Sequence, residues 1–150
     1  MNRLVFSIVM CLMALTNPIW AEDKLTINDF IITPGVTDKE FVISLDNDIP
    51  YAAFQFDLYL PKGMTVTSYN SEQSRLPQST SLEMNIQPDN SYRFIAVANN
   101  LEDISGTRGS IIKLTISADK STTIGDLTGY FKNIKLSKAN GEGKRYEEIS

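Results

Sequence analysis

The chain has 150 residues, of which 14 are basic and 18 acidic, so its formal net charge is −4. It contains no histidine and a single cysteine, which excludes Ser-His and Cys-His nucleophilic catalysis, His-ligated zinc and a disulfide framework. The acidic balance also argues against nucleic acid or an anionic membrane surface as a partner.

Residues 1–21 have the layout of a secretory signal peptide, with Ala21 as the last residue removed. Arg3 supplies the basic start, and an apolar run from Leu4 to Leu15 follows before the breaker Pro18. A retained membrane anchor is the alternative, but the run is shorter than the ~20 residues that cross a bilayer. We therefore expect export to the periplasm, the cell surface or the medium, with no membrane span after cleavage.

Residues 22–150 form one domain of ordinary size, and loss of Arg3 changes its formal charge from −4 to −5. Alternating apolar side chains predict strands from its first residues onward. Leu25 and Ile27 share one parity whereas Phe30 and Ile32 share the other, which predicts a bulge or a crossing between sheets. A turn at 33–36 and a strand at 41–45 come next.

The stretch 53–61 is the strand around which we expect the sheet to be organised. One side carries four large apolar residues and the other side is mostly polar, because strand side chains alternate. The apolar set is Phe54, Phe56, Leu58 and Leu60, and the opposite set is Gln55, Asp57 and Tyr59. Pro61 and Gly63 end the strand.

The remaining pattern predicts further strands and no helix. The expected strands are 64–68, a hairpin of 82–86 with 92–98, then 112–116, 125–137 with a bulge near Lys132 or Asn133, and 144–149 after the Asn140-Gly141 turn. The polar stretch 69–81 is a long loop whose role the sequence leaves open. About nine strands at regular spacing predict an all-β chain, folded as an antiparallel β-sandwich.

Five segments together resemble a known family. They are Thr33-Pro-Gly35, Phe41-Val-Ile-Ser-Leu45, Ala53-Phe-Gln-Phe-Asp-Leu-Tyr-Leu-Pro61, Ile104-Ser-Gly106 and Gly109-Ser-Ile-Ile-Lys-Leu-Thr-Ile116. In this order they resemble a cohesin module, most nearly the cohesin-like domains of secreted proteins from Bacteroides-type bacteria. The resemblance implies a nine-stranded sandwich of jelly-roll topology, a fold shared with carbohydrate-binding modules. It also implies a protein partner of the dockerin type, bound through the outer face of one sheet.

The same resemblance makes strand 53–61 a neighbour of strand 92–98. If Tyr92 and Phe94 face the core, the outer surface would carry six candidate partner-binding residues: Gln55, Asp57, Tyr59, Arg93, Ile95 and Val97. Apolar, aromatic and charged groups in one cluster suit protein recognition. With the opposite parity, Ile95 and Val97 would point inward instead.

Three other functions are weaker alternatives. Carbohydrate binding would use exposed rings among Tyr51, Tyr59, Tyr69, Tyr92, Tyr130 and Tyr146, although tyrosine also caps sandwich edges. Acidic pairs such as Asp46 and Asp48 could serve glycoside hydrolysis or calcium, but a polar turn explains them more simply. The sequence thus predicts a non-catalytic binding module with no cofactor and no metal, acting on a protein or, alternatively, on a polysaccharide.

Overall fold

A computed structural model describes residues 23–28, 30–122 and 130–149. These residues form nine strands and no helix, and hence no helix that could cross a membrane. The strands are β1 (Lys24–Ile27), β2 (Lys39–Asp46), β3 (Ala53–Tyr59), β4 (Met64–Asn70), β5 (Thr80–Ile86), β6 (Tyr92–Ala98), β7 (Arg108–Ala118), β8 (Tyr130–Ser137) and β9 (Gly143–Ile149).

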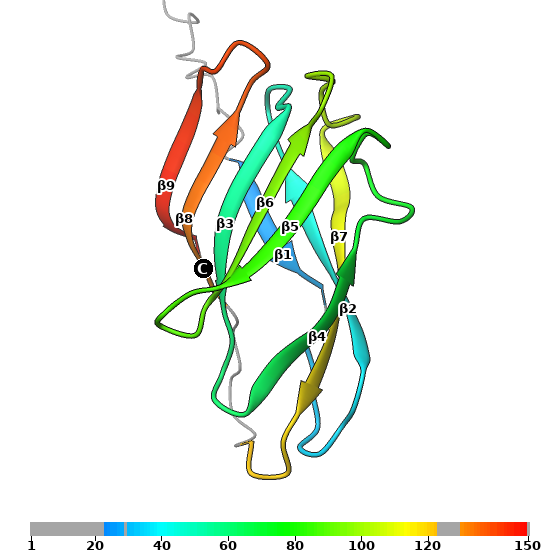
Figure 1. The fold of residues 1–150 in the computed structure, drawn as a ribbon, viewed down its shortest axis with the longest axis vertical. Helices are drawn as coiled ribbons and strands as arrows, with labels where there is room; N and C mark the ends of the chain where they lie inside the picture. The colour runs from blue at the N-terminus through cyan, green and yellow to red at the C-terminus, as the bar shows by residue number, and fades with distance from the viewer. Residues whose placement is uncertain (1–22, 29, 123–129, 150) are drawn as a thin grey trace, which may run out of the picture.

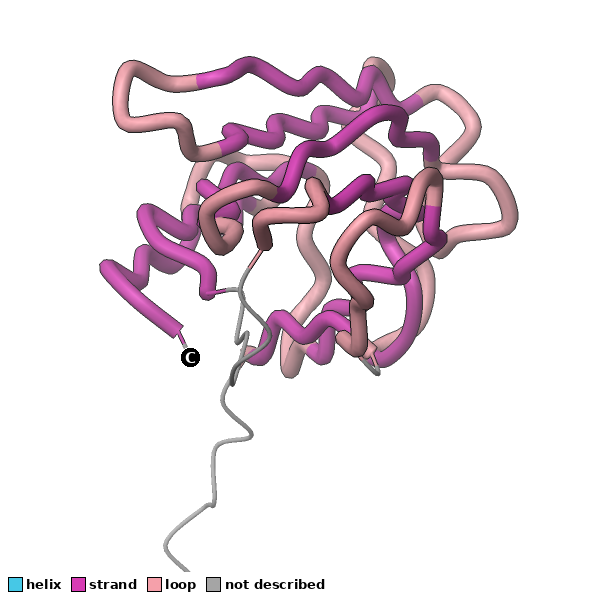
Figure 2. The backbone as a smooth tube through the Cα atoms, turned by 90° about the horizontal axis from the view of Figure 1, so that it is seen from below, coloured by secondary structure: helices cyan, strands magenta, loops and turns pink. Residues whose placement is uncertain are grey.

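Two antiparallel sheets pack against each other as the layers of a sandwich (Figures 1 and 2). One sheet has the strand order β1-β2-β7-β4 and the other β5-β6-β3-β8-β9. Only strands adjacent within a sheet exchange backbone hydrogen bonds, so the two layers are joined chiefly by side-chain packing. The predicted all-β sandwich of nine antiparallel strands is confirmed.

Strand β3 lies at the centre of the five-stranded sheet, and its inward side chains fill the core. Phe54, Phe56 and Leu58 are buried, as their alternation predicts. The ring of Phe56 lies 5.3 Å from the rings of Phe94 on β6 and Phe131 on β8. Aromatic contacts of this kind add roughly 0.5–1.5 kcal/mol each to the burial of apolar area.

The facing sheet supplies aliphatic side chains to the same core. Ile43 and Leu45 on β2 and Leu114 on β7 are fully buried. One polar contact also crosses between the layers, because the Val66 amide on β4 donates to the Tyr92 hydroxyl on β6 at 3.3 Å. Since the described residues contain no cysteine, packing and such contacts hold the sandwich together.

The prediction of a bulge or sheet crossing near the start of the domain was wrong for the described residues. Strand β1 ends at Ile27, and residues 30–36 form a loop instead of a continuing strand. Phe30 folds back from this loop, and its ring centroid lies 4.7 Å from that of Phe41. The change of parity between Ile27 and Phe30 therefore marks the end of a strand.

The predicted bulge in β8 is confirmed. Gln55 of β3 pairs with Lys135 and Asp57 pairs with Lys132, so two residues of β8 oppose Phe56 alone. The extra residue is Asn133, whose φ of 51° lies in the left-handed region that asparagine tolerates well. Because of the bulge, two lysines three positions apart pair with the outward-facing residues Gln55 and Asp57.

The loop between β4 and β5 is anchored by one arginine. The guanidinium of Arg75 donates to the carbonyl oxygens of Leu45, Ser105 and Gly106 at 2.5–2.6 Å and to the side-chain oxygen of Asn47 at 2.7 Å. Burial lowers the pKa of Arg75, and nearby Asp46 opposes that change. This loop, whose role the sequence left open, therefore ties together three segments that meet at one end of the sandwich.

A buried carboxylate joins the start of the described chain to its last strand. Asp23 accepts hydrogen bonds from the hydroxyls of Tyr51 (2.7 Å) and Tyr146 (2.8 Å), and its Oδ2 lies 3.1 Å from Nζ of Lys144. Burial alone would raise the pKa of Asp23, but these three partners together lower it. Lys144 also pairs with Asp48 at 2.9 Å. The carboxylate of Asp48, one of the two considered above as calcium ligands, therefore has a lysine as its partner.

Candidate functional site

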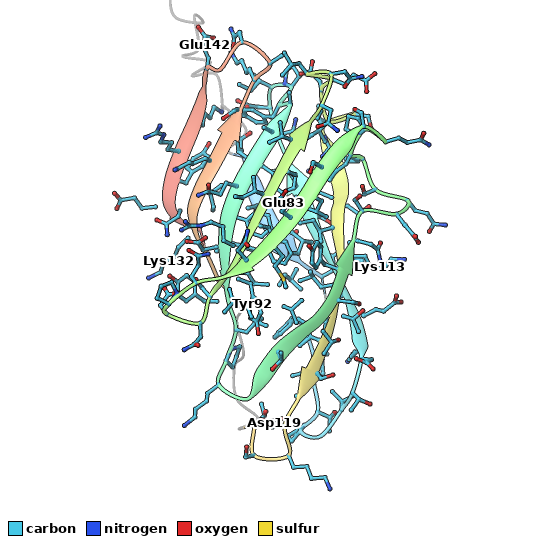
Figure 3. The ribbon with its side chains drawn as sticks, in the orientation of Figure 1. Glu83, Tyr92, Lys113, Asp119, Lys132 and Glu142 are labelled. Atoms are coloured by element: carbon cyan, nitrogen blue, oxygen red, sulfur yellow. The ribbon has the colours of Figure 1, made fainter. Side chains whose placement is uncertain are left out.

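The outer face of the five-stranded sheet brings the predicted residues of β3 and β6 together. Gln55 lies opposite Ile95, and Asp57 lies opposite Arg93. Tyr92 and Phe94 are buried, so the parity that sends Arg93, Ile95 and Val97 outward is the one observed. Figure 3 looks onto this face, with Glu83 of the edge strand β5 near the middle of the view and Lys132 of β8 at the left.

Asp57 projects on this outer side but is covered by its neighbours. Arg93 donates to its two oxygens from Nε and Nη2, both at 2.7 Å, and Nδ2 of Asn133 donates to Oδ2 at 2.7 Å. The Asp57 side chain is only 2% exposed, compared with 32% for Arg93. Burial would raise the pKa of Asp57, but the hydrogen bonds from Arg93 and Asn133 outweigh it and hold that pKa below its ordinary value.

The two residues of this pair differ in how far a partner can reach them. The Asp57 carboxylate has little surface to offer a partner and serves instead to orient the Arg93 guanidinium on the face. Bidentate carboxylate pairing fixes an arginine in one plane more firmly than a single contact does. Arg93 is therefore the member of this pair that a bound partner can reach.

Tyr59 lies at the end of β3, beside the β5–β6 turn. Its hydroxyl donates to Oδ2 of Asp89 at 2.5 Å, and this hydrogen bond raises the pKa of Tyr59. The Lys132 ammonium lies 5.5 Å from the centre of its ring, within the range of a cation–π contact. The ring of Tyr59 is half-buried, so only part of it is accessible at the border of the face, where β3 ends.

The apolar part of the face lies on β6. Val97 is 41% exposed and Ile95 is half-buried, and both are on the outer side. Isolated surface apolar residues are ordinary, but neighbouring ones along a central strand form a small patch that water solvates poorly.

The sequence interpretation missed the charged residues on the flanking strands. Lys132 and Lys135 pair with Asp57 and Gln55, Arg145 of β9 pairs with Lys135, and Glu83 of β5 pairs with Ile95. For the two lysines of β8, the bulge predicted near Lys132 or Asn133 was the signal that could have identified them. Combined with the pairing of β3 and β8, it would have placed both lysines on the outer side.

The outer face of the four-stranded sheet has a different composition. On its two inner strands the outward residues include Val42, Ser44, Thr115 and Ser117. Thr65 on β4 is exposed. Charged residues also lie on this surface, since Lys113 pairs with Val42 and Glu40 pairs with Thr115. Val42 is the only large apolar side chain at the outward positions of these two strands, whereas the other sheet carries both Ile95 and Val97 on its outer side.

The described residues contain no group of three or more His, Cys, Asp or Glu side chains that could hold a metal ion. The tyrosines do not form a ring platform either. Tyr51 and Tyr92 are buried, and Tyr69 is half-buried with its ring 5.7 Å from that of Phe94. Of the tyrosines whose side chains are described, Tyr59 is the one on the mixed face. The arrangement is suited to surface recognition.

These features define the described part of the chain as a nine-stranded antiparallel β-sandwich in which the outer face of the five-stranded sheet carries both apolar and charged side chains. Within that class the chain has the cohesin fold, since the solved structures to which it is similar are cohesin modules. No protein-family model and no curated protein matches the sequence.

Three of these structures show the extent of the likeness. The sixth cohesin of scaffoldin B from Acetivibrio cellulolyticus, solved with a Cel5 dockerin mutant, has a TM-score of 0.67 at 12% identity, covering 82% of this chain and 91% of that one. A non-cellulosomal cohesin from the archaeon Archaeoglobus fulgidus has a TM-score of 0.60 at 16% identity, covering 82% and 83%. A cohesin module from a family 33 glycoside hydrolase of Clostridium perfringens has 0.63 at 10% identity, covering 85% and 90%.

Proposed function

We propose that this protein is an exported, non-catalytic, cohesin-like module that binds a protein partner through the outer face of its five-stranded sheet. The observation that carries the proposal is the apolar pair Ile95 and Val97 on the inner strand β6, flanked by Arg93 on the same strand and by charged residues on neighbouring strands. An apolar centre with a polar rim is the usual anatomy of a protein interface.

The likeness to solved cohesins supports a partner of the dockerin type. Several of the similar structures are complexes of a cohesin with a dockerin, among them one from Acetivibrio cellulolyticus and two from Clostridium thermocellum. Shared fold at such low identity does not carry over the identity of a partner, and the affinity of this chain depends on its own surface. A Bacteroides-type origin stays a prediction.

Export is the second part of the proposal. It rests on the layout of residues 1–21, which lie outside the described residues and are followed by a domain without cysteine. A sandwich held by packing alone can fold in an oxidising or a reducing compartment, so this absence is compatible with export. N-terminal sequencing of the secreted protein is expected to begin at Glu22.

A single charge placed on each sheet tests the binding face. Val97→Asp introduces a carboxylate at the apolar centre of the proposed face, and Thr65→Asp introduces the same group on an exposed position of the other sheet. Each purified variant is immobilised beside the wild type and exposed to the secreted proteins of the source organism. The captured protein is then purified and its Kd measured by calorimetry.

We expect Val97→Asp to weaken binding about tenfold or more, because a buried unpaired charge at an interface centre is costly, and Thr65→Asp to leave Kd unchanged. Equal affinity for wild type and Val97→Asp would refute the assignment of the face. A glycan array is the parallel arm, and specific retention of a polysaccharide without a protein partner would favour the carbohydrate alternative. Asp57 is unsuitable as a probe of the face, because its replacement is expected to lower stability by removing the acceptor of Arg93 and Asn133.

A further inference from the structure

One transverse row of the mixed face carries a charge gradient. In register from β9 to β5, the row consists of Arg145, Lys135, Gln55, Ile95 and Glu83. It therefore begins with two cations, passes a neutral amide and an aliphatic side chain, and ends with an acid. The order follows directly from the strand order β5-β6-β3-β8-β9.

The two cations of this row, Lys135 and Arg145, face each other without an acidic partner in an ion pair in the described part of the chain. Lys135 and Arg145 are cross-strand partners, both are exposed, and neither forms an ion pair within the described residues. Like charges placed directly opposite each other destabilise a sheet. The whole chain carries a net charge of −4, so an excess of cations does not explain this placement.

Neighbouring cations show that the chain pairs such groups elsewhere. Lys144 lies beside two carboxylates and Lys138 pairs with Glu142 at 3.4 Å. Lys138 lies in the turn between β8 and β9, and Lys144 lies in β9. Glu147 shares the outer side of β9 with Arg145, yet no ion pair forms at Lys135 or Arg145 within the described residues, so the unpaired state of these two cations is a local feature of the hairpin.

A shallow pocket of about 240 Å³ opens at the same position. Its lining residues are Lys135, Leu136, Ser137, Gly141, Gly143, Lys144 and Arg145. None of them is acidic, and of the three cations Lys144 is already paired with Asp23 and Asp48. Gly143 has no room for a side chain, since a Cβ there would lie 2.0 Å from the carbonyl oxygen of Leu136. The hollow therefore combines two cationic side chains, a hydroxyl and bare backbone, which suits an oxygen anion.

We propose that this pocket receives a carboxylate side chain of the protein partner and thereby fixes the orientation in which the partner docks. The inference rests on the proposed function. The acidic part of the partner lies over β8 and β9, its apolar part covers Ile95 and Val97, and its cationic part faces Glu83. A protein surface presents all three kinds of group within one interface, whereas an anionic polysaccharide would leave the apolar residues uncovered.

Charge reversal of one cation separates a binding role from a structural one. Arg145→Glu replaces a repulsive cross-strand pair with an attractive one, so the unliganded protein is expected to gain about 1–3 °C in Tm. The same change is expected to weaken the captured partner about tenfold or more. The matched control is Lys62→Glu, an identical charge change at an exposed position between β3 and β4, which should leave Kd unchanged.

A probe of known chemistry tests the pocket without the natural partner. Pentaglutamate is titrated into the isotope-labelled protein, and amide shifts are followed by NMR. Saturable shifts confined to Lys135, Ser137, Gly143 and Arg145 are expected in the wild type and in Lys62→Glu. They should vanish in Arg145→Glu and fade as salt shortens the range of the charges.

The outcomes distinguish this inference from the proposed function. If Arg145→Glu holds the partner as tightly as the wild type while Val97→Asp does not, the face is correct and the docking orientation is wrong. If both variants bind normally, the proposed function fails as well. A fall in Tm for Arg145→Glu, or tighter binding of a sulfated polysaccharide than of pentaglutamate at the same residues, would also overturn the carboxylate assignment.

Discussion

The ion pair between Asp57 and Arg93 is expected to stabilise the five-stranded sheet by an amount that a double-mutant cycle can measure. Asp57→Asn removes the charge with little change of shape, and Arg93→Met removes the charge while keeping an apolar side chain over the strand. The cycle compares both single variants with the double variant, so that the coupling energy reports the pair itself.

The structure sets the size of the effect. Two charge-assisted hydrogen bonds of 2.7 Å join the pair, and bonds of this kind contribute ~1.5–3 kcal/mol each when buried. Because Arg93 is 32% exposed, it regains part of its hydration when Asp57 is neutralised. We therefore expect a coupling energy of about 2 kcal/mol and a loss of about 2–3 kcal/mol for Asp57→Asn alone.

Urea unfolding at pH 7 provides the assay, with stability taken from the midpoint at constant slope. The control cycle uses Arg108 and Asp46, a pair 3.1 Å apart whose arginine is 82% exposed, and its coupling is expected to be below about 0.5 kcal/mol. A coupling between Asp57 and Arg93 as small as that of the control would refute the argument from burial.

The same pair predicts a direction for the pH dependence. The pKa of Asp57 in the folded protein lies below its ordinary 3.8, so the unfolded chain binds its proton first as the pH falls. The stabilisation is complete at pH 7, declines once the pH drops below the unfolded pKa, and is lost as the pH passes through the folded pKa. A coupling energy that grows on acidification would contradict this assignment.

Three further changes test other features of the fold by the same unfolding assay. Arg75→Ala should cost about 2–4 kcal/mol because it removes the donor of four hydrogen bonds, and a loss below about 1 kcal/mol would show that the loop is not anchored this way. Gly143→Ala should cost about 2–4 kcal/mol, since the added Cβ would meet a carbonyl oxygen of β8. Gly141→Ala is the comparison: Gly141 has a φ of 85° and open space around it, so its replacement should cost only about 1 kcal/mol. Equal losses of stability for the two variants would contradict the steric explanation. Tyr51→Phe should cost about 1–2 kcal/mol because it takes a hydroxyl from the buried Asp23 carboxylate, and an unchanged midpoint would mean that the other partners of Asp23 compensate.

Local patterns were sufficient to predict most of the sandwich. The alternation at Phe54, Phe56 and Leu58 identified β3 as a half-buried strand, and the odd spacing between Phe131 and Ile134 located the bulge of β8. Both depend on side-chain periodicity along a few residues, which is visible in the chain itself. The change of parity after Ile27 misled the same reasoning, because a strand end and a bulge look alike in sequence.

The covering of Asp57 could not be predicted, because its partners are distant along the chain. Arg93 lies 36 residues away and Asn133 lies 76 residues away, on the strands to either side. The acceptors of Arg75 include three backbone carbonyls, which every residue possesses, so the sequence contains no specific signal for that anchor. Tertiary register decided both cases.

The bulge at Asn133 serves both the core and the outer face of the sheet. It allows Phe131 to remain beside Phe56 while Lys132, the next residue, pairs with the outward-facing Asp57. Pairing the present sequence without a bulge would turn Phe131 toward water and Lys132 into the core, whereas deleting Asn133 would keep both residues on their present sides and remove the amide that donates to Asp57. The bulge therefore does two separate jobs, because its extra length keeps Phe131 in the core and the Asn133 side chain completes the set of donors around the Asp57 carboxylate.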